Sequence, residues 1–329
     1  MVNSSQQRSF VLSKTRLMIY TTLACCVLSC TSHKTINEIQ YDSGSKILLP
    51  DTGQTFSFTN TAGEDSDYSF NPQSFTDNKN GTITDNITGL VWQQMDGGEM
   101  TFENAGNYCS SLNLGGKNDW RLPTSHELFD INDFSRINPA LNTTYFTNTQ
   151  AEYWWTSDLR IDDPTKVWVV NAGGGVGAHP KSETVSAGGT KQFHTRAVRS
   201  NNSAPVIINH LNNTGVGTIT DNRTGLIWQQ IPSPNTMTWE EALTYASSLA
   251  LGGVTGWRIP NIKEIQSLND EKIFKPSFDK NYFPSISSGN FWSSTSMQNA
   301  SSKAWDINVD YGIVSYNEKT VKEYVLCVK

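Results

Sequence analysis

Few residues of this chain have the types and spacing that catalysis requires. The sequence holds no H-E-x-x-H zinc motif, no G-x-S-x-G serine and no phosphate-binding loop. The five histidines do not recur between the two halves of the chain: His33, His126, His179, His194 and His210. The residues therefore predict a protein that is not an enzyme and that needs no cofactor.

A run of aromatic and charged residues is better suited to holding a sugar or a peptide. It continues into a glycine-rich stretch, and loops on a rigid scaffold are where binding surfaces usually vary. We predict a ligand-binding site formed by Tyr153, Trp154, Arg160, Asp162, Asp163, His179 and Lys181. The competing interpretation is a solvated hairpin without a ligand.

Calcium is a second possible ligand, with Asp77 and Asp85 as the candidate residues. The run from Asp77 to Gly81 loosely resembles a calcium loop, in which oxygen ligands alternate along the chain. Lys79 occupies the third position, however, and residues 209–213 in the second half lack a carboxylate. The residue pairs Asp85-Asn86 and Asp221-Asn222 also favour ordinary Asx turns.

The elements that position these residues occur twice. GTITDNITGLVWQQ from Gly81 returns as GTITDNRTGLIWQQ from Gly217, and DWRLPTSHEL returns as GWRIPNIKEI. This period is far longer than the 20–50 residues of solenoid repeats. We therefore expect a tandem duplication of a whole domain, with a separate core in each copy.

Each copy predicts short strands, two helices and then further aromatic strands. Asn80-Gly81 favours a type I′ hairpin turn. Capping boxes begin at Thr124, Thr238 and Asn261, and Gly252-Gly253 is the expected end of the helix that follows Thr238. Arg121 and Arg258 are expected in structural salt bridges or carbonyl clamps rather than in contact with a ligand. The tryptophans at matched places are expected in the cores: Trp92, Trp120, Trp155, Trp168, Trp228, Trp257, Trp292 and Trp305. The predicted fold class is α+β.

The N-terminus predicts export and lipidation. Basic residues precede the apolar run Leu17–Leu28, which is too short to span a bilayer but is typical of a signal peptide. The run ends in Val-Leu-Ser-Cys, which resembles a lipobox and makes Cys30 the expected acylated anchor. The alternatives are lipidation at Cys25 and an ordinary signal peptide without lipid.

The predicted organisation has five parts. Residues 1–29 are a lipoprotein signal peptide, and residues 30–73 are a polar tether with one strand that docks on the first repeat. Domain 1 covers residues 74–200, a linker covers residues 201–205, and domain 2 covers residues 206–329. The formal net charge of −6 argues against a nucleic-acid partner, since nucleic-acid binding needs a basic surface.

The ordered motifs G-T-x-T-D-N-x-T-G-L-x-W-Q, x-L-x-L-G-G and W-R-[LI]-P, followed by an aromatic-W-[TS]-S step, resemble the Lcl C-terminal domain family. This resemblance covers about residues 75–329. It implies two tandem C-type-lectin-like domains, each with two helices and a small twisted antiparallel sheet. It also implies binding at the cell surface or in the periplasm, with sulfated polysaccharide as the ligand of the adhesin that names the family.

The family commonly places two cysteines where this chain has only one in each copy. Cys109 matches Ala246, and Cys327 matches Ala197. Either each copy has lost one cysteine independently, or the terminal strands exchange so that Cys109 and Cys327 form a disulfide in an oxidising compartment.

Three functions remain open. The leading one is an adhesin-like lipoprotein, anchored by acyl chains in the bacterial envelope and expected in the outer membrane, that binds a polysaccharide or an extracellular protein. The second is a structural envelope component that acts through protein contacts only. The third is an enzyme of the formylglycine-generating type, for which the chain lacks the reactive cysteine pair.

Overall fold

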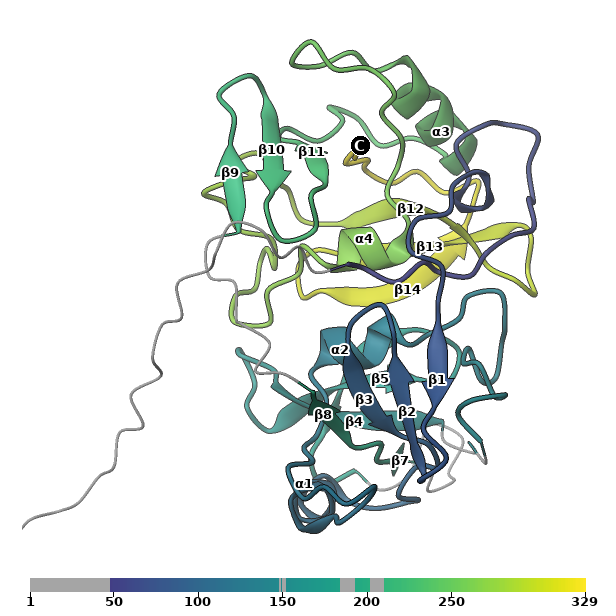
Figure 1. The fold of residues 1–329 in the computed structure, drawn as a ribbon. Helices are drawn as coiled ribbons and strands as arrows, with labels where there is room; N and C mark the ends of the chain where they lie inside the picture. Colours follow the sequence, from purple (N-terminus) through teal and green to yellow (C-terminus); the bar gives the residue numbers. More distant parts are fainter. Residues whose placement is uncertain (1–47, 148, 150–151, 184–192, 202–209) are drawn as a thin grey trace, which may run out of the picture. The chain divides into compact units, whose positions relative to one another are not determined.

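The computed structural model describes residues 48–147, 149, 152–183, 193–201 and 210–329. The predicted signal peptide, Cys30, the first part of the tether up to residue 47 and most of the linker therefore lie outside the described residues. Both repeats belong to one compact unit of the chain, which covers residues 40–329 (Figure 1).

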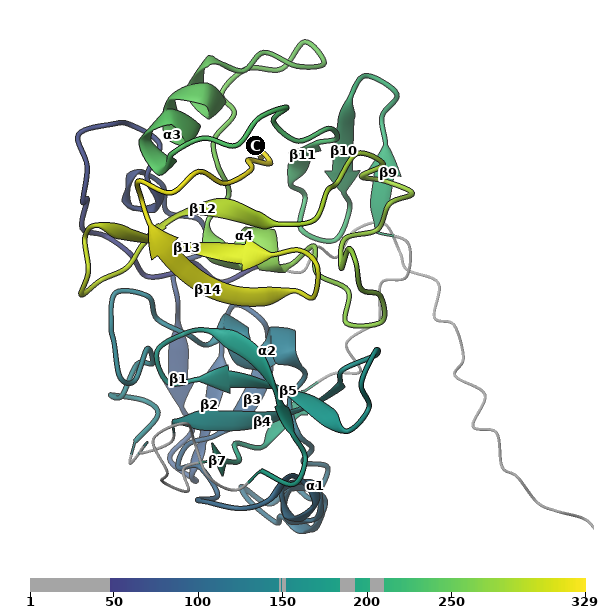
Figure 2. The ribbon, with the colours of Figure 1, turned by 180° about the vertical axis from the view of Figure 1, so that it is seen from behind.

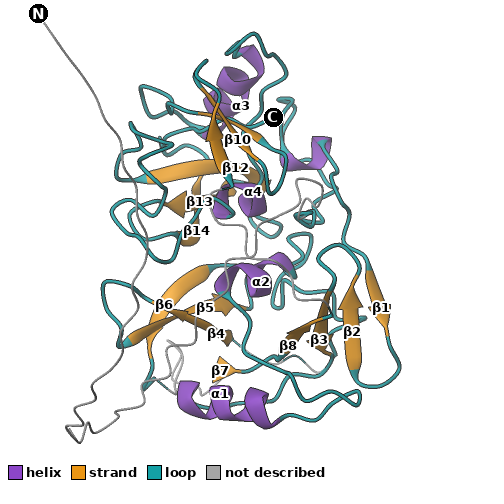
Figure 3. Ribbon diagram, turned by 60° about the vertical axis from the view of Figure 1, so that its left-hand side comes forward, coloured by secondary structure: helices purple, strands orange, loops and turns teal. Residues whose placement is uncertain are grey.

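The two repeats present their helices and strands in the same order, except that the strands at residues 193–194 and 198–200 of the first repeat correspond only to isolated β-bridges at Tyr324 and Val328 in the second. The first holds β1 (Phe75–Asp77), β2 (Thr82–Asp85), β3 (Leu90–Gln93), α1 (Phe102–Ser111), α2 (Ser125–Asp130), β4 (Tyr153–Leu159), β5 (Lys166–Asn171), β6 (Val176–Pro180), β7 (Phe193–His194) and β8 (Val198–Ser200). The second holds β9 (Leu211–Asn213), β10 (Thr218–Asp221), β11 (Ile227–Gln229), α3 (Trp239–Ser248), α4 (Ile262–Gln266), β12 (Asn290–Ser296), β13 (Lys303–Asn308) and β14 (Ile313–Glu318). Two helices and several antiparallel strands in each repeat confirm the α+β class (Figure 3).

The expectation that each repeat has its own small sheet is wrong for the largest sheet, called the main sheet below, which contains strands of both repeats. Seven strands follow the order β12-β13-β14-β6-β5-β4-β7, of which β12, β13 and β14 lie side by side in Figure 2. Strand β14 pairs antiparallel with β6 at Val314 and Val176. These two valines occupy equivalent positions in the two repeats. The main sheet therefore runs without a break from one repeat into the other. An approximate two-fold axis between β6 and β14 relates the strands of the first repeat to those of the second.

The hydrophobic cores follow the same pattern. One private cluster in the first repeat surrounds Cys109, Trp120 and Trp155, and one in the second surrounds Trp257, Trp292 and Cys327. A third, larger cluster draws residues from both repeats: Trp92, Phe134, Trp154 and Trp168 with Trp228, Ile265, Phe291 and Trp305. A separate core for each copy is thus only part of the arrangement, because the repeats also share one.

Side-chain caps begin the helices as the sequence predicts. Thr124, Thr238 and Asn261 each form a complete capping box with the glutamate three residues later. The expected end of α3 is wrong: the helix ends at Ser248 with Leu249 as its C-cap. Gly252 and Gly253 adopt positive φ in the turn that follows.

The turn between β1 and β2 also differs from the type I′ prediction. Positive φ occurs at Lys79 and Gly81, so the left-handed residues flank Asn80 and the loop runs over residues 78–81. Asx turns form as expected, since the carboxylates of Asp85 and Asp221 accept bonds from the backbone two residues later.

The N-terminal segment, residues 48–73, corrects the tether prediction. It forms no strand; its one regular element is a 3-10 helix, η1 (Asp65–Asp67). Its side chains bond mainly to the second repeat rather than to the first. Gln54, for example, exchanges two hydrogen bonds with Ser296 of β12 in the second repeat. Asp65 also accepts a 2.6 Å bond from Thr295. The segment is therefore a packed part of the fold.

Candidate functional site

The structure does not bring the seven predicted ligand residues together. Tyr153 and His179 lie on one face of the main sheet, where their rings contact Phe193. The Lys181 ammonium lies 5.7 Å from the centre of the Phe102 ring on the same side. Tyr153, His179 and Phe193 therefore form a cluster in which the aromatic rings pack against one another.

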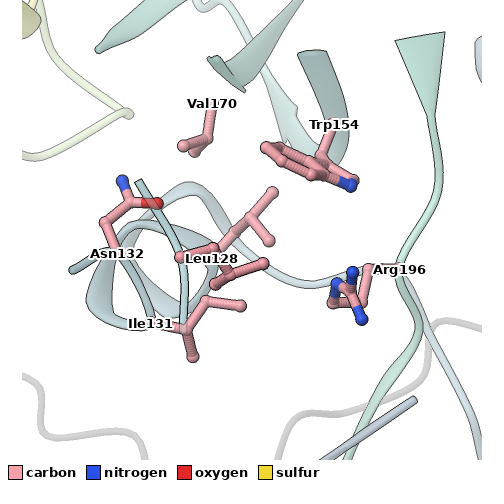
Figure 4. A pocket seen from close by; sticks show the side chains of 7 residues that line it. Leu128, Ile131, Asn132, Trp154, Val170 and Arg196 are labelled. Carbon is pink, nitrogen blue, oxygen red and sulfur yellow. The ribbon is translucent and has the colours of Figure 1, made fainter. Parts of the chain in front are cut away.

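Trp154 points to the opposite face of the sheet and is buried at 3% exposure. It lines a cavity of about 10 Å³, roughly the size of one water molecule, beside Leu128, Val170 and Arg196 (Figure 4). The fully buried Arg196 donates to the carbonyls of Gln93 and Gln94 at 2.8 and 2.6 Å. This cavity is too small for a sugar, so Trp154 is a core residue.

Arg160, Asp162 and Asp163 lie elsewhere again. Arg160 forms two bonds to Asp162, at 2.6 and 2.9 Å, and its guanidinium lies 4.3 Å from the centre of the Tyr311 ring in the second repeat. Asp163 pairs with Lys166. These residues form a polar contact between the repeats, and their charges are already paired.

A larger pocket lies between the N-terminal segment and the second repeat. Its volume is about 450 Å³, within the usual range for small-molecule sites. Aromatic, cationic, anionic and amide side chains line it together: Tyr68, Phe70, Arg258, Lys329, Asp51, Glu264, Asn71 and Asn261. It is the pocket of the described residues that best combines ligand-sized volume with varied chemistry.

Arg258 and Glu264 form the polar centre of this pocket. The guanidinium donates two bonds of 2.6 Å to the two carboxylate oxygens. Glu264 also accepts the backbone N–H of Asn261, so the same carboxylate caps α4 and fixes the arginine. Burial lowers the pKa of Arg258, but Glu264 outweighs it and raises the pKa overall. The pair is a rigid, planar and permanently charged hydrogen-bonding surface.

Two aromatic rings from the N-terminal segment complete the pocket. The Arg258 guanidinium lies 5.2 Å from the centre of the Tyr68 ring and 5.0 Å from that of Phe70. The rings lie nearly parallel, at 11°, with centroids 6.2 Å apart. Asp51 holds this arrangement by accepting a bond from the Phe70 backbone. Aromatic rings can pack against the apolar face of a sugar, while the planar polar groups beside them can bond to its hydroxyl groups. The same combination of groups suits a short peptide.

The first repeat carries the same ion pair without the aromatic cover. Arg121 donates to Glu127 at 2.7 and 2.6 Å, as predicted for a structural salt bridge. The Arg121 side chain is 42% exposed, whereas that of Arg258 is 7% exposed. This difference in exposure arises because the rings of Tyr68 and Phe70 cover Arg258. In the described part of the chain, no equivalent pair of rings covers Arg121. The two sites therefore form a natural matched pair.

Sequence reasoning missed this pocket because its two walls lie far apart in the chain. The local sequence indicates only a structural role for Arg258 and a place in a tether for Tyr68 and Phe70. One signal was present: these aromatic residues interrupt a stretch that is otherwise rich in Ser, Thr, Asn and Asp.

Of the two alternatives left open for the cysteines, the structure shows the one without a disulfide. Cys109 and Cys327 are both free and buried, and each lies in the private core of its own repeat. The backbone of Cys327 bonds to Gln229 within the second repeat, just as Ala197 bonds to Gln93 within the first. The terminal strands are therefore not exchanged, and each cysteine faces the alanine-bearing position of its own copy.

The carboxylates of the two calcium candidates are used within the fold. Asp77 bonds to the backbone and side chain of Lys79, and Asp85 bonds to Ile87 and Thr88. Among the residues that the structure describes, no group of three or more His, Cys, Asp or Glu side chains converges as a metal site. None of the described helices has the length and apolar character needed to cross a bilayer.

Comparison with known families agrees with this duplicated architecture. The Lcl C-terminal domain matches residues 81–199 and again residues 217–329. No curated protein is similar enough to the chain to be identified as a relative. The two matches cover well over half of the chain and coincide with its two repeats. The chain therefore belongs to the Lcl C-terminal domain family and carries this domain twice.

Proposed function

We propose that this chain is a non-enzymatic lipoprotein of the bacterial cell envelope that binds an extracellular polysaccharide or protein in an adhesin-like manner. Acylation at Cys30, an outer-membrane location and a C-type-lectin-like ancestry of each repeat belong to this proposal. The observation that carries the binding function is the pocket of about 450 Å³ built around Arg258, Tyr68 and Phe70.

The charges of the pocket indicate the kind of ligand. Arg258 is paired with Glu264, and the Lys329 ammonium bonds to the carbonyl of Thr255. Asp51 supplies a further negative charge beside them. Because these charges are nearly balanced, the pocket favours a neutral or zwitterionic polar ligand, such as an unsulfated sugar, over a strongly anionic polymer.

A glycan array with the soluble chain from residue 31 onward tests the proposal. We expect selective binding of a small set of glycans by the wild-type protein. The variant Tyr68→Ala removes a ring from the pocket without leaving a buried charge, and should weaken binding at least tenfold. Arg121→Ala, which breaks the uncovered ion pair of the first repeat, should leave binding of the same glycans unchanged.

The result that opposes glycan binding is a blank array from protein shown to be folded. Capture of one defined envelope protein, lost in Tyr68→Ala, would then identify the ligand as a protein. Capture that survives Tyr68→Ala would instead support a structural envelope component that uses other surfaces.

A further inference from the structure

The N-terminal segment covers the end of β12 in the second repeat, whereas the equivalent end of β4 in the first repeat is open. Thr295 and Ser296, at the end of β12, are fully buried. The motif matches place Asp158 and Leu159 of β4 at the same positions. Asp158 is partly exposed, and Leu159 is 42% exposed. The described chain therefore covers only one of two matching strand ends.

The backbone supports the equivalence of these strand ends. Strands β4 and β12 each have a register shift just before their last residue. Asp158 accepts the backbone N–H of Ser125, the first residue of α2, and Thr295 accepts that of Ile262, the first residue of α4. The two ends thus hold the same place in their repeats and differ in what lies over them.

The cover on the second repeat shows what kind of partner such a strand end accepts. The Gln54 side chain bonds to the backbone of Ser296 at 2.9 and 3.0 Å. Glu64 accepts the hydroxyl of Ser296, and Asp65 accepts that of Thr295. Further along the segment, two aromatic rings lie over the arginine that pairs with α4. The cover is therefore a polypeptide that supplies an amide, two carboxylates and two rings.

The first repeat keeps the arginine of this face but changes the two residues beside it. Arg121 remains available to an aromatic ring, since its side chain is 42% exposed. Asp158 replaces the hydroxyl of Thr295 and would repel a carboxylate. Leu159 replaces the hydroxyl of Ser296 and has no side-chain proton to donate. The two changes disfavour the N-terminal segment of a second copy, because that segment presents two carboxylates here.

The open strand end also exposes apolar surface. Leu159 is 42% exposed, and Ile161, two residues further on, is 51% exposed. The matching residues of the second repeat are Ser296 and Gln298, which are both polar. The first repeat thus favours a partner with apolar side chains at this place.

Only part of the equivalent path is open on the first repeat. In the second repeat, Lys263 of α4 bonds to the carbonyl oxygen of Asp51 in the N-terminal segment. In the first repeat, His126 holds the equivalent position in α2, and Asn269 and Glu271 contact it instead. A partner would therefore take the place that corresponds to residues 54–73.

We propose that the end of β4 and the exposed Arg121–Glu127 pair dock a polypeptide segment of a partner protein. The segment lies as residues 54–73 lie on the second repeat. It places an aromatic residue over Arg121 and an apolar residue against Leu159, and it presents no carboxylate to Asp158. This docking surface is separate from the Arg258 pocket and does not depend on the ligand proposed for that pocket.

Two synthetic peptides test this surface by fluorescence anisotropy on the full chain, purified in detergent. One peptide copies residues 54–73, and the other carries Asp65→Asn. Glu64 is retained in both because it also bonds to Ser57 and Phe58 within the segment. We expect the Asp65→Asn peptide to bind one site per chain, at least tenfold more tightly than the unchanged peptide, because it avoids the repulsion from Asp158.

Two variants of the protein assign the binding to this face. Arg121→Ala should weaken binding of the Asp65→Asn peptide at least tenfold. Arg136→Ala is the matched control, because Arg136 is also 42% exposed and pairs with Asp133 in the same repeat. This control should bind the peptide like the wild type.

A converse variant gives the first repeat the residues that the N-terminal segment contacts in the second. It combines Asp158→Thr with Leu159→Ser, and the new hydroxyl at position 158 can still accept the N–H of Ser125, as Thr295 accepts that of Ile262. This protein should bind the unchanged peptide at least tenfold more tightly than the wild type does.

Three results, each on protein shown to be folded, would overturn the proposal. The first is wild-type protein that binds neither peptide, or binds both equally well. The second is an Arg121→Ala variant that binds the Asp65→Asn peptide as tightly as the wild type. The third is a glycan whose binding is lost in Arg121→Ala while neither peptide binds, which would assign this face to a sugar.

Discussion

His126 and Lys263 occupy the same position in α2 and α4, and each reaches across to the other repeat. His126 lies 3.1 Å from the carbonyl oxygen of Asn269 and 3.0 Å from Glu271. Lys263 donates to the carbonyl oxygens of Asp51 and Asp130 at 2.9 and 2.8 Å. Each helix thus places a cation against carbonyl groups at the end of the opposite helix. The contact is reciprocal, although the two residues differ.

The His126–Glu271 pair predicts a specific pH dependence of stability. Burial lowers the pKa of His126, but Glu271 outweighs it and raises the pKa to about 9, above the ordinary value of 6.5. The pair therefore contributes fully below about pH 6.5 and loses its contribution as the pH rises through 9. We expect this loss to be on the order of 2 kcal/mol in the free energy of unfolding.

Urea unfolding of the wild type and His126→Gln at pH 6, 7.5 and 9 measures this contribution. Other buried groups also titrate in this range, so the quantity to compare is the difference between the two proteins, which should shrink toward pH 9. His179→Gln, which removes a histidine paired with Glu183, provides the control. A difference that stays constant with pH would contradict the assignment.

At the scale of elements, the N-terminal segment is held by side chains rather than by a ladder of backbone bonds. Glu64 bonds to Ser296, and Asp65 bonds to Thr52 and Thr295. Lys263 ties the segment to both repeats at once, because Asp51 belongs to the segment and Asp130 to the first repeat. The segment therefore depends on a few buried polar contacts.

Lys263→Met should destabilise the protein by about 2–4 kcal/mol, because two buried carbonyl oxygens lose their donor. It should also expose residues 48–73 to limited proteolysis. Lys303→Met, which removes a partly exposed lysine from an ion pair with Glu318, should change stability by less than about 0.5 kcal/mol. Wild-type stability combined with an unchanged cleavage pattern would show that Lys263 does not hold the segment.

The sequence predicts the local devices well. The capping boxes span three residues and the Arg121–Glu127 and Arg258–Glu264 pairs span six, so short motifs determine them. The docking of Gln54 on Ser296 could not be predicted in this way, since 242 residues separate them. The polar composition of residues 48–73 is compatible both with a free tether and with a segment that is hydrogen-bonded to the fold. Only the distant partner, such as Ser296 for Gln54, distinguishes the two.

At the scale of the whole molecule, the shared core couples the two repeats. Phe134 of the first repeat packs edge-on against Trp305 of the second, with ring centroids 5.2 Å apart. Gly174 lies at this contact, where a Cβ atom would come within 2.9 Å of the Phe134 ring. The repeats therefore cannot lose their packing independently, and we expect one cooperative unfolding transition.

The two buried thiols report on this transition separately. Burial raises the pKa of Cys109 to about 12 and that of Cys327 further still, so neither should be alkylated in the native protein. In pulsed alkylation across a urea series without reductant, Cys109 and Cys327 should become reactive at the same midpoint. Different midpoints would show independent repeats, and no labelling of the unfolded chain would show a disulfide.

The pairing of β6 with β14 bears on how such a chain could arise. A single repeat would leave the equivalent strand as an open sheet edge, which readily recruits another strand. Two identical copies meeting edge to edge would form a symmetric dimer with the geometry seen here within one polypeptide. In such a dimer both subunits have the same sequence, so equivalent contacts on the two sides of the axis use the same residues. After fusion, the two halves can differ in sequence at these contacts. That freedom is visible where His126 faces Glu271 on one side of the axis and Lys263 faces backbone carbonyls on the other.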